Sequence, residues 1–282
     1  MEPLEYNYIK RQVLALTQVD LNCYKAPQMQ RRLKAYLNRS GYDNWSRFFR
    51  SLQNDPVALR KFKDYLTINV SAFFRDPDKY KHLQTIILPE LLSRHPILRV
   101  WSAGCSRGQE PYSLSILLAE ATPSDYRHQI IATDLDSSAL AWAKAGGPYT
   151  PDELIHVSPV LLSRYFNYRD RAHWVGKELQ SRISFRQHNL LADPIIGGFD
   201  LIICRNVVIY FEAAAKDELY RRFYQALRPG GVLFVGGTEI VPKASDIGLQ
   251  TIGLSFYQRG NLRQTSARIT HQAILKNPEA KS

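Results

Sequence analysis

The feature that most constrains the fold lies between Ile97 and Glu120, where a short apolar run meets a turn of small residues and then an apolar helical pattern. This order predicts a buried parallel strand, a tight turn and a helix. Gly104 and Gly108 let the backbone turn sharply and approach a ligand, and Pro111 suits the first turn of a helix. An ordinary strand-to-helix turn has the same pattern, so the glycines alone do not decide the function.

The spacing of these glycines disfavours a phosphate cradle. It is not the Gly-x-Gly-x-x-Gly of dinucleotide-binding enzymes, and no Gly-Lys-Ser/Thr follows to hold a triphosphate. Glu110, beside the turn, suits a ligand that carries an amine or another cationic group. S-adenosylmethionine (SAM) joins such groups to a nucleoside, and we expect it as the cofactor, without a metal ion.

A second candidate binding residue follows the next predicted strand, in the segment HQIIATDLD. In parallel sheets an acidic residue after the second strand typically accepts hydrogen bonds from ribose hydroxyls, and Asp134 is the natural candidate. The alternative is that it caps the helix beginning near Ser137. Asp136 is better placed for that role, so we predict Asp134 as the ribose ligand.

Residues 199–211, FDLIICRNVVIYF, predict another buried strand that ends in polar side chains. Arg205, Asn206 and Tyr210 follow Leu201–Ile203, where the strand should emerge at the same ligand-binding edge. For Tyr210 the alternative is a packing role, in which protein groups satisfy its hydroxyl.

Basic charge is concentrated near the N-terminus. The chain of 282 residues has a net charge of +11, and the segment from Lys25 to Lys63 contains ten basic and two acidic residues, an excess of eight positive charges. Such an excess predicts an acidic partner, whether nucleic acid, a membrane surface or a protein. The predicted helix after Pro27 carries four of these residues on one face, Arg31, Arg32, Lys34 and Arg39. Simple solvation of that face is an equally good interpretation.

The periodicity divides the chain into unlike parts. We expect a small, basic all-α domain at residues 1–76, a linker helix at 77–96, an α/β domain at 97–260 with an insertion at about 167–182, and a polar tail at 261–282. The insertion fits neither the sheet nor its crossover helices, and Val175–Lys177 suggests a small β excursion in it. Taken alone, the pattern at residues 73–76 predicts that Phe73 and Phe74 pack a linker against the core. Arg75 and Asp76 are then expected to pair with each other at the surface.

Cysteine and histidine usage indicates a reducing compartment. Cys23, Cys105 and Cys204 lack the spacing of a metal site, and the seven histidines are scattered. No segment reads as a signal peptide or a membrane span. We therefore expect a soluble cytoplasmic protein that is not embedded in the membrane.

Six sequence blocks together resemble one family. They are NVSAFFRD, RVWSAGCSRGQEPYS, ATDLD, FRQHNLL, ICRNVVIYF and LRPGGVLFVGGTE. In this order and spacing they resemble the chemotaxis receptor methyltransferases of the CheR type over nearly the whole chain. The resemblance implies a small all-α domain followed by a Rossmann-like class I methyltransferase domain with an inserted β-subdomain.

The resemblance also implies roles for individual residues. The residues implied to contact the cofactor are Asn69, Ser71, Arg75, Gly104, Glu110, Asp134, Asn189, Leu190, Arg205 and Asn206. Arg75 and Tyr210 would lie near the transferred methyl group. Two positions depart from the family pattern, because Ser71 stands where threonine is usual and Gln109 where a glutamate is frequent. Ser71 keeps the hydroxyl, and Glu110 is retained.

The implied activity is that of a protein-glutamate O-methyltransferase. It would transfer the methyl group of SAM to glutamate γ-carboxylates on the cytoplasmic helices of chemotaxis receptors, giving methyl esters and S-adenosylhomocysteine (SAH) for sensory adaptation. The acidic receptors, in their membrane arrays, would be the partners of the basic face.

Two other classes of function remain as alternatives. A nucleic-acid methyltransferase would share the fold and explain the charge, but amino-methylating enzymes usually carry Asn/Asp-Pro-Pro-aromatic where this chain reads Cys204-Arg205-Asn206-Val207. A non-catalytic binding protein would merely retain the cofactor pocket.

Overall fold

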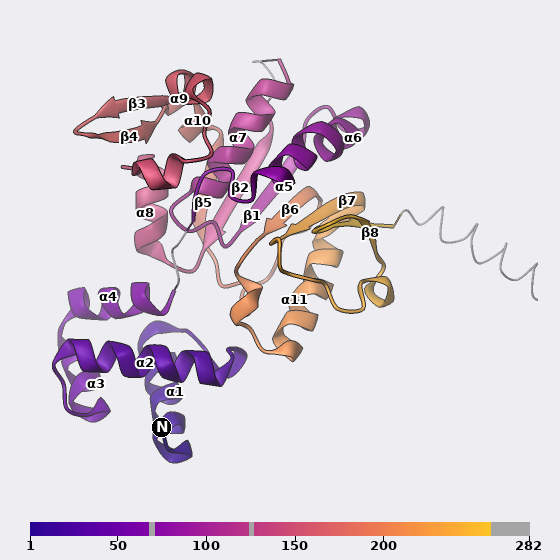
Figure 1. The fold of residues 1–282 in the computed structure, drawn as a ribbon. Coiled ribbons are helices and arrows are strands. Elements are labelled where there is room, and N and C mark those ends of the chain that lie inside the picture. The colour runs from indigo at the N-terminus through magenta and orange to yellow at the C-terminus, as the bar shows by residue number, and fades with distance from the viewer. Residues whose placement is uncertain (68–70, 124–126, 261–282) are drawn as a thin grey trace, which may run out of the picture.

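The computed structural model describes residues 1–67, 71–123 and 127–260, and Figure 1 shows their arrangement. Residues 1–67 form a separate layer of helices: α1 (Pro3–Thr17), the short turn η1 (Leu21–Cys23), α2 (Ala26–Ser40), α3 (Trp45–Asn54) and α4 (Pro56–Leu66). Their shared core is largely aromatic. Trp45, Phe48, Phe49 and Phe62 are buried there with Leu33.

Local side chains set the ends of these helices. The Asn44 side chain accepts a hydrogen bond from the Arg47 amide at the start of α3, and Asp55 accepts two from the first amides of α4. Such side chains satisfy helix amides that have no intrahelical partner. Gly41 ends α2 in the left-handed conformation (φ 75°), which glycine adopts without steric cost.

A helical connection leads from this layer to the α/β domain. It consists of α5 (Pro77–His82), a π-helical segment η2 (Leu83–Ile87) and α6 (Leu88–Arg94). The buried residues Leu83, Ile87 and Leu91 place one side of it against the sheet. The strand expected at the start of the α/β domain follows at once.

The central sheet has seven strands in the order β5-β2-β1-β6-β7-β9-β8. Their bounds are β1 Arg99–Ala103, β2 Gln129–Asp134, β5 Ile183–Gln187, β6 Phe199–Cys204, β7 Leu227–Val235, β8 Leu249–Gly253 and β9 Phe256–Arg259. The first five in this order pair in parallel, whereas β9 is antiparallel to both β7 and β8. Strands β9 and β8 thus close the sheet as an antiparallel pair. Strand β7 begins at Leu227, directly after α11 (Ala213–Ala226).

Alternation along the strands separates two apolar layers. Val100 on β1 packs in a cluster with Leu114 of α7 (Gln109–Ala121) and Leu140 of α8 (Ser137–Ala145). The next residue, Trp101, packs on the opposite face with Phe223 of α11 (Ala213–Ala226). Figure 1 shows α6, α7 and α8 on one side of the sheet and α11 on the other. The doubly covered parallel sheet confirms the predicted α/β class.

The excursion between β2 and β5 carries its own small sheet. After α8 come η3 (Pro151–Leu154), α9 (Pro159–Tyr165), the antiparallel hairpin of β3 (Phe166–Arg169) and β4 (Ala172–Val175), and α10 (Lys177–Ser181). The β structure expected around Val175–Lys177 lies earlier than predicted. The hairpin turns at Asp170 and Arg171, both with positive φ, as two-residue turns that match the twist of a hairpin require. These residues are not the usual Asn-Gly turn signal.

One carboxylate, that of Asp136, joins α8 to the helical layer. It accepts hydrogen bonds from the Ser138 and Ala139 amides and from the Thr67 hydroxyl, the last at 2.8 Å. We expect Asp136→Ala to lower the free energy of unfolding by about 2 kcal/mol, the sum of a lost cap and a lost buried hydrogen bond. Asp136→Asn should lose less, because its amide oxygen still accepts hydrogen bonds. Urea denaturation measures both variants, and an alanine variant as stable as the wild type would contradict this assignment.

Candidate cofactor-binding and active site

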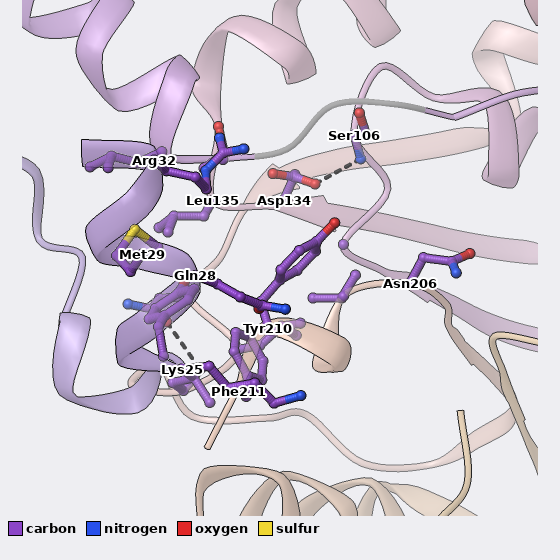
Figure 2. Close-up of a pocket in the computed structure, with 18 of the residues that line it drawn as sticks. Lys25, Gln28, Met29, Arg32, Ser106, Asp134, Leu135, Asn206, Tyr210 and Phe211 are labelled. Atoms are coloured by element: carbon purple, nitrogen blue, oxygen red, sulfur yellow. Dashed lines mark hydrogen bonds between the residues drawn. The ribbon is translucent and has the colours of Figure 1, made fainter. Parts of the chain in front are cut away.

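Two adjoining cavities lie at the carboxyl ends of β1, β2 and β6. The larger encloses about 890 Å³ including its open mouth, and the smaller about 450 Å³. They share the lining residues Gly104, Ser106, Asn206 and Val207, so they lie side by side, and we call the two together the cleft. Ligands of open α/β sheets bind at this edge. Figure 2 shows the larger cavity, with Asp134 and Tyr210 on its walls.

The turn after β1 shapes the centre of the cleft. Gly104 has φ 86°, and a Cβ atom there would lie 2.5 Å from Val207 Cγ2. The Gly104 and Cys105 amides donate hydrogen bonds to the Thr133 carbonyl, at 2.8 and 2.9 Å. The absence of a side chain at Gly104 thus lets the turn after β1 and the loop after β6 approach closely.

Asp134 ends β2 beside this turn. Its Oδ2 accepts a hydrogen bond from the Ser106 amide at 2.7 Å, and its Oδ1 accepts one from the Asp136 amide at 2.9 Å. Burial raises the pKa of Asp134 to about 6. Each oxygen retains capacity for a further hydrogen bond, which suits ribose hydroxyls. Asp136 caps α8, as the sequence predicted, so the cap is not the role of Asp134.

Glu110 occupies the first turn of α7 and lines the smaller cavity. The carboxylate accepts a hydrogen bond from the Ser102 hydroxyl at 2.7 Å. Burial raises the pKa of Glu110 to about 7, although the nearby Arg205 opposes the shift. A buried carboxylate of this kind favours a cationic ligand group that would offset its desolvation.

Arg205 fixes the segment that leads into α5. Its guanidinium, almost fully buried, donates to Asp76 Oδ2 at 2.6 Å and to the Arg75 carbonyl at 2.9 Å, and it lies over the Phe234 ring at 4.7 Å. The predicted surface pair between Arg75 and Asp76 is therefore wrong, because the Asp76 carboxylate pairs with Arg205 instead. Phe73 and Phe74 are buried in the core, as the linker interpretation expected. The role of Arg205 toward the cofactor stays a prediction.

The remaining predicted cofactor contacts divide between the cavities. Ser71 and Arg75 line the smaller one, whereas Asn189 and Leu190 line the larger one. The Asn189 side chain accepts from the Leu191 amide at 3.0 Å and so shapes the turn after β5. The predicted contact Asn69 lies outside the described residues.

Asn206 and Tyr210 occupy the loop after β6. Asn206 has φ 58° and lines both cavities, and its amide donates to Glu239 Oε2 at 3.0 Å. Tyr210 ends the short helix η4 (Val208–Tyr210) and lines the larger cavity. Its ring points into that cavity in Figure 2. Tyr210 is half-buried, and it also packs against the apolar cluster that contains Phe223, so the packing role stays an alternative to a role in the cavity.

The sequence patterns did not predict that the helical layer forms one wall of the larger cavity. The residues of that layer that line the larger cavity are Tyr24, Lys25, Gln28, Met29, Arg32, Leu66 and Thr67. Nothing in their local pattern marks them as ligand-facing, because their neighbours in the cavity lie far away in the chain. The Ser106 amide, which binds Asp134, and the Glu239 carboxylate, which binds the Asn206 amide, were not predicted for the same reason.

The four basic residues of α2 do not share one environment. Arg31 and Lys34 are exposed. Arg32 donates to the Tyr65 carbonyl, stacks on the Tyr65 ring at 4.7 Å and lines the larger cavity. Arg39 is exposed and lies over the same ring at 4.9 Å. The sequence pattern predicted that all four lie on one exposed face. Arg32 differs from the other three because it is half-buried and its guanidinium donates to the Tyr65 carbonyl.

Comparison with known families is consistent with this cleft. Residues 69–255 match the CheR methyltransferase SAM-binding domain, and residues 4–67 match the CheR methyltransferase all-alpha domain. The chain belongs to the CheR methyltransferase family. The resemblance inferred from the six sequence blocks and the predicted two-domain architecture are thereby confirmed.

Curated relatives are similar over most of their length. A chemotaxis protein methyltransferase of Listeria innocua is 39% identical over 254 residues, which cover 90% of this chain and 96% of the relative. Chemotaxis protein methyltransferase 1 of Pseudomonas aeruginosa is 37% identical over 76% of this chain and 82% of its own. The chemotaxis protein methyltransferase of Salmonella typhimurium is 36% identical over 77% of this chain and 76% of its own.

The family carries a SAM-binding domain, and the cleft suits that cofactor. The buried Glu110 lines the smaller cavity and suits an amine, whereas the half-buried Asp134 lines the larger one and suits ribose hydroxyls. Within the described residues, no group of three or more His, Cys, Asp or Glu side chains could hold a metal ion. No helix in the described ranges is long and apolar enough to cross a membrane.

We predict that Asp134→Ala weakens SAM and SAH binding by similar amounts, because a ribose contact does not sense the methyl group. The loss should be about 2 to 4 kcal/mol for two hydrogen bonds to a charged acceptor. Titration calorimetry with both ligands measures the change. Unchanged affinity for both would rule out the ribose assignment.

Glu110 should make SAH binding depend on pH. Below its pKa of about 7 the side chain is neutral and cannot pair with the ligand's ammonium group, so affinity should fall as the pH drops through that value. Glu110→Gln should bind more weakly at high pH and lack this fall. A remaining decrease nearer pH 6 would reflect Asp134. An identical pH profile in the wild type and the glutamine variant would contradict the role of Glu110.

Proposed function

We propose that this protein methylates glutamate γ-carboxylates on the cytoplasmic helices of chemotaxis receptors, using SAM and releasing SAH, in the service of sensory adaptation. The observation that carries the proposal is the cleft itself. Its two adjoining cavities are lined by two carboxylates, with the buried Glu110 beside Arg75 in one and the half-buried Asp134 with Tyr210 in the other, next to the basic helix α2. The names of the relatives, chemotaxis protein methyltransferases, support the same partner class.

In this proposal different residues of the cleft bind different parts of SAM. Asp134 holds the ribose, the turn at Asn189 and Leu190 borders the adenine, and Glu110 receives the amine of the methionine part. Asn69, Ser71, Arg205 and Asn206 complete the set carried over from the family. When bound, SAM supplies a methyl group on a positively charged sulfur, which a carboxylate oxygen can accept.

The chain's contribution to the chemistry is alignment and exclusion of water. A glutamate with an ordinary pKa near ~4.3 is already ionised at neutral pH, so no general base is required. The opposite charges of nucleophile and sulfonium disappear during transfer, and a site with little water therefore favours the transition state. The apolar walls formed by Val207 and Leu135 suit this requirement.

Arg75 and Tyr210 are the proposed groups nearest the reaction. Arg75 orients the incoming carboxylate from the smaller cavity, and the Tyr210 hydroxyl acts from the larger one. A tight ion pair with Arg75 would make the carboxylate a poorer nucleophile. Orientation with only partial neutralisation is therefore the arrangement that supports transfer.

The proposed partner is acidic and helical, which matches α2. Arg31, Lys34 and Arg39 are exposed on this helix, and its first turns line the cofactor cavity through Gln28 and Met29. A glutamate-rich receptor helix lying along α2 would bring a target side chain to the cleft. The proposal implies work in the cytoplasm at receptor arrays, without nucleic acid and without a metal ion.

A direct assay tests the proposed function against its alternatives. The protein is incubated with methyl-labelled SAM and receptor cytoplasmic fragments, and alkaline treatment then releases methanol from carboxyl esters. Volatile label that depends on receptor glutamates supports the proposal. Label that resists alkali, or that appears only with nucleic acid, would refute it. SAM binding without transfer to any receptor fragment would instead favour the non-catalytic alternative.

The role of α2 can be tested by charge reversal that spares the packed Arg32. We expect Arg31→Glu with Lys34→Glu to lower kcat/KM for receptor and to flatten its dependence on salt. Each exposed contact is worth about 1 kcal/mol or less and is screened over about 8 Å at physiological salt. SAH affinity should not change, because neither residue lines a cavity.

A matched control carries the same charge change elsewhere. Lys81→Glu with Arg221→Glu alters exposed residues of α5 and α11. If kcat/KM for receptor falls equally in the control and the α2 variant, the loss comes from the change in net charge and not from the position of α2. If the α2 variant keeps the wild-type efficiency and salt slope, the basic face is merely solvated.

A further inference from the structure

The helical layer and the loop after β6 are joined by a short backbone bridge. Tyr24, just after η1, pairs with Phe211 as an isolated antiparallel β-bridge. The Lys25 amide donates to the Tyr210 carbonyl at 3.0 Å, and the Glu212 amide donates to the Cys23 carbonyl at 2.9 Å. We call residues 23–25 and 210–212 the domain bridge. It connects segments almost two hundred residues apart in the sequence.

Side chains reinforce this bridge. The rings of Tyr24 and Phe211 meet edge to face, with centroids 5.2 Å apart and planes at 90°. Tyr24 packs against the apolar cluster of the helical layer and also against the cluster beneath α11. Tyr24 and Lys25 line the larger cavity together with Tyr210 and Phe211. Figure 2 labels Lys25, Tyr210 and Phe211 there. The bridge is therefore part of the cavity wall.

Tyr210 depends on this bridge for its position. Its own amide reaches the Val207 carbonyl only at 3.5 Å, which is a weak hydrogen bond, whereas its carbonyl receives the 3.0 Å bond from Lys25. Lys25 is also the N-terminal cap residue of α2. The element that carries the exposed basic residues therefore begins at the group that holds Tyr210.

We infer that the domain bridge is a positioning element for methyl transfer, through which the helical layer holds Tyr210 in its working place. Residues 23–25 do not contact the reacting atoms in this inference; they act through the backbone of Tyr210. The inference rests on the proposed role of Tyr210 in methyl transfer. It makes the helical layer a structural part of the active site in addition to a docking surface.

The bridge allows a selective test with proline. Lys25 has φ −57° and Glu212 has φ −66°, both close to the angle that proline imposes. The residues before them, Tyr24 and Phe211, are extended, as residues before proline prefer to be. Lys25→Pro and Glu212→Pro therefore each remove one donor of the bridge without forcing the backbone into a new conformation.

Each proline variant is compared with the alanine variant at the same position, which loses the same side chain but keeps the amide. We expect kcat for receptor methylation, per SAH-binding molecule, to fall about fivefold or more from alanine to proline, as loss of one positioning hydrogen bond implies. From alanine to proline the SAH dissociation constant should change by less than about twofold, because both variants remove the same side chain from the cavity wall. If kcat is the same in the proline and alanine variants, the inference is wrong.

A second background separates positioning from general stability. In Tyr210→Phe, which already lacks the hydroxyl, the proline substitutions should cost much less in kcat than in the wild type, because coupled groups are not additive. An equal loss in both backgrounds would show that the bridge acts only through stability and would overturn the inference. Thermal melting of each variant accompanies the assay. If both proline variants are unfolded, Tyr24→Leu, which removes the ring contact, is tested against Tyr24→Phe in the same two backgrounds.

These outcomes are distinct from failure of the proposed function. If the wild type does not methylate receptor fragments, the proposed function fails before the bridge is tested. If the wild type is active and the proline and alanine variants match, the proposed function stands and the positioning role alone is refuted.

Discussion

The hydrogen bonds between the turn after β1 and the end of β2 are the constraint on which the rest of the site depends. Gly104 and Cys105 donate to the Thr133 carbonyl, and the Ser106 amide donates to the Asp134 carboxylate. They are possible because Gly104 adopts a left-handed conformation without a side chain in the way of Val207. One turn therefore joins two parallel strands, orients an acid and leaves space for a ligand.

Buried charge organises the other end of the cleft. Glu110 and Arg205 are both largely removed from water, and each lowers the cost of burying the other. Arg205 also holds Asp76 and the Arg75 carbonyl, so a residue at the end of β6 determines the path of the segment before α5. The same guanidinium thus stabilises the fold and sets the electrostatics around Arg75.

The helical layer completes the cleft, and two of its attachments to the α/β domain border the larger cavity. Thr67 binds Asp136 at the start of α8, and the domain bridge pairs Tyr24 with Phe211. Between these points the first turns of α2 form a wall of the larger cavity. A layer that the sequence presents as a separate basic domain therefore encloses the same space as the strand ends of the sheet.

The sequence by itself determined whatever depends on near neighbours in the chain. Strand alternation placed Val100 and Trp101 on opposite faces, small residues produced the turn at Gly104, and Asp136 could be assigned as a cap because a cap acts within three residues. Tertiary structure decided the pairing of Asp76 with Arg205, the packing of Arg32 on Tyr65 and the bridge at Tyr24. These partners are more than thirty residues apart in the chain. Only the folded chain brings such partners within reach, since no local pattern records which distant group will meet a given side chain.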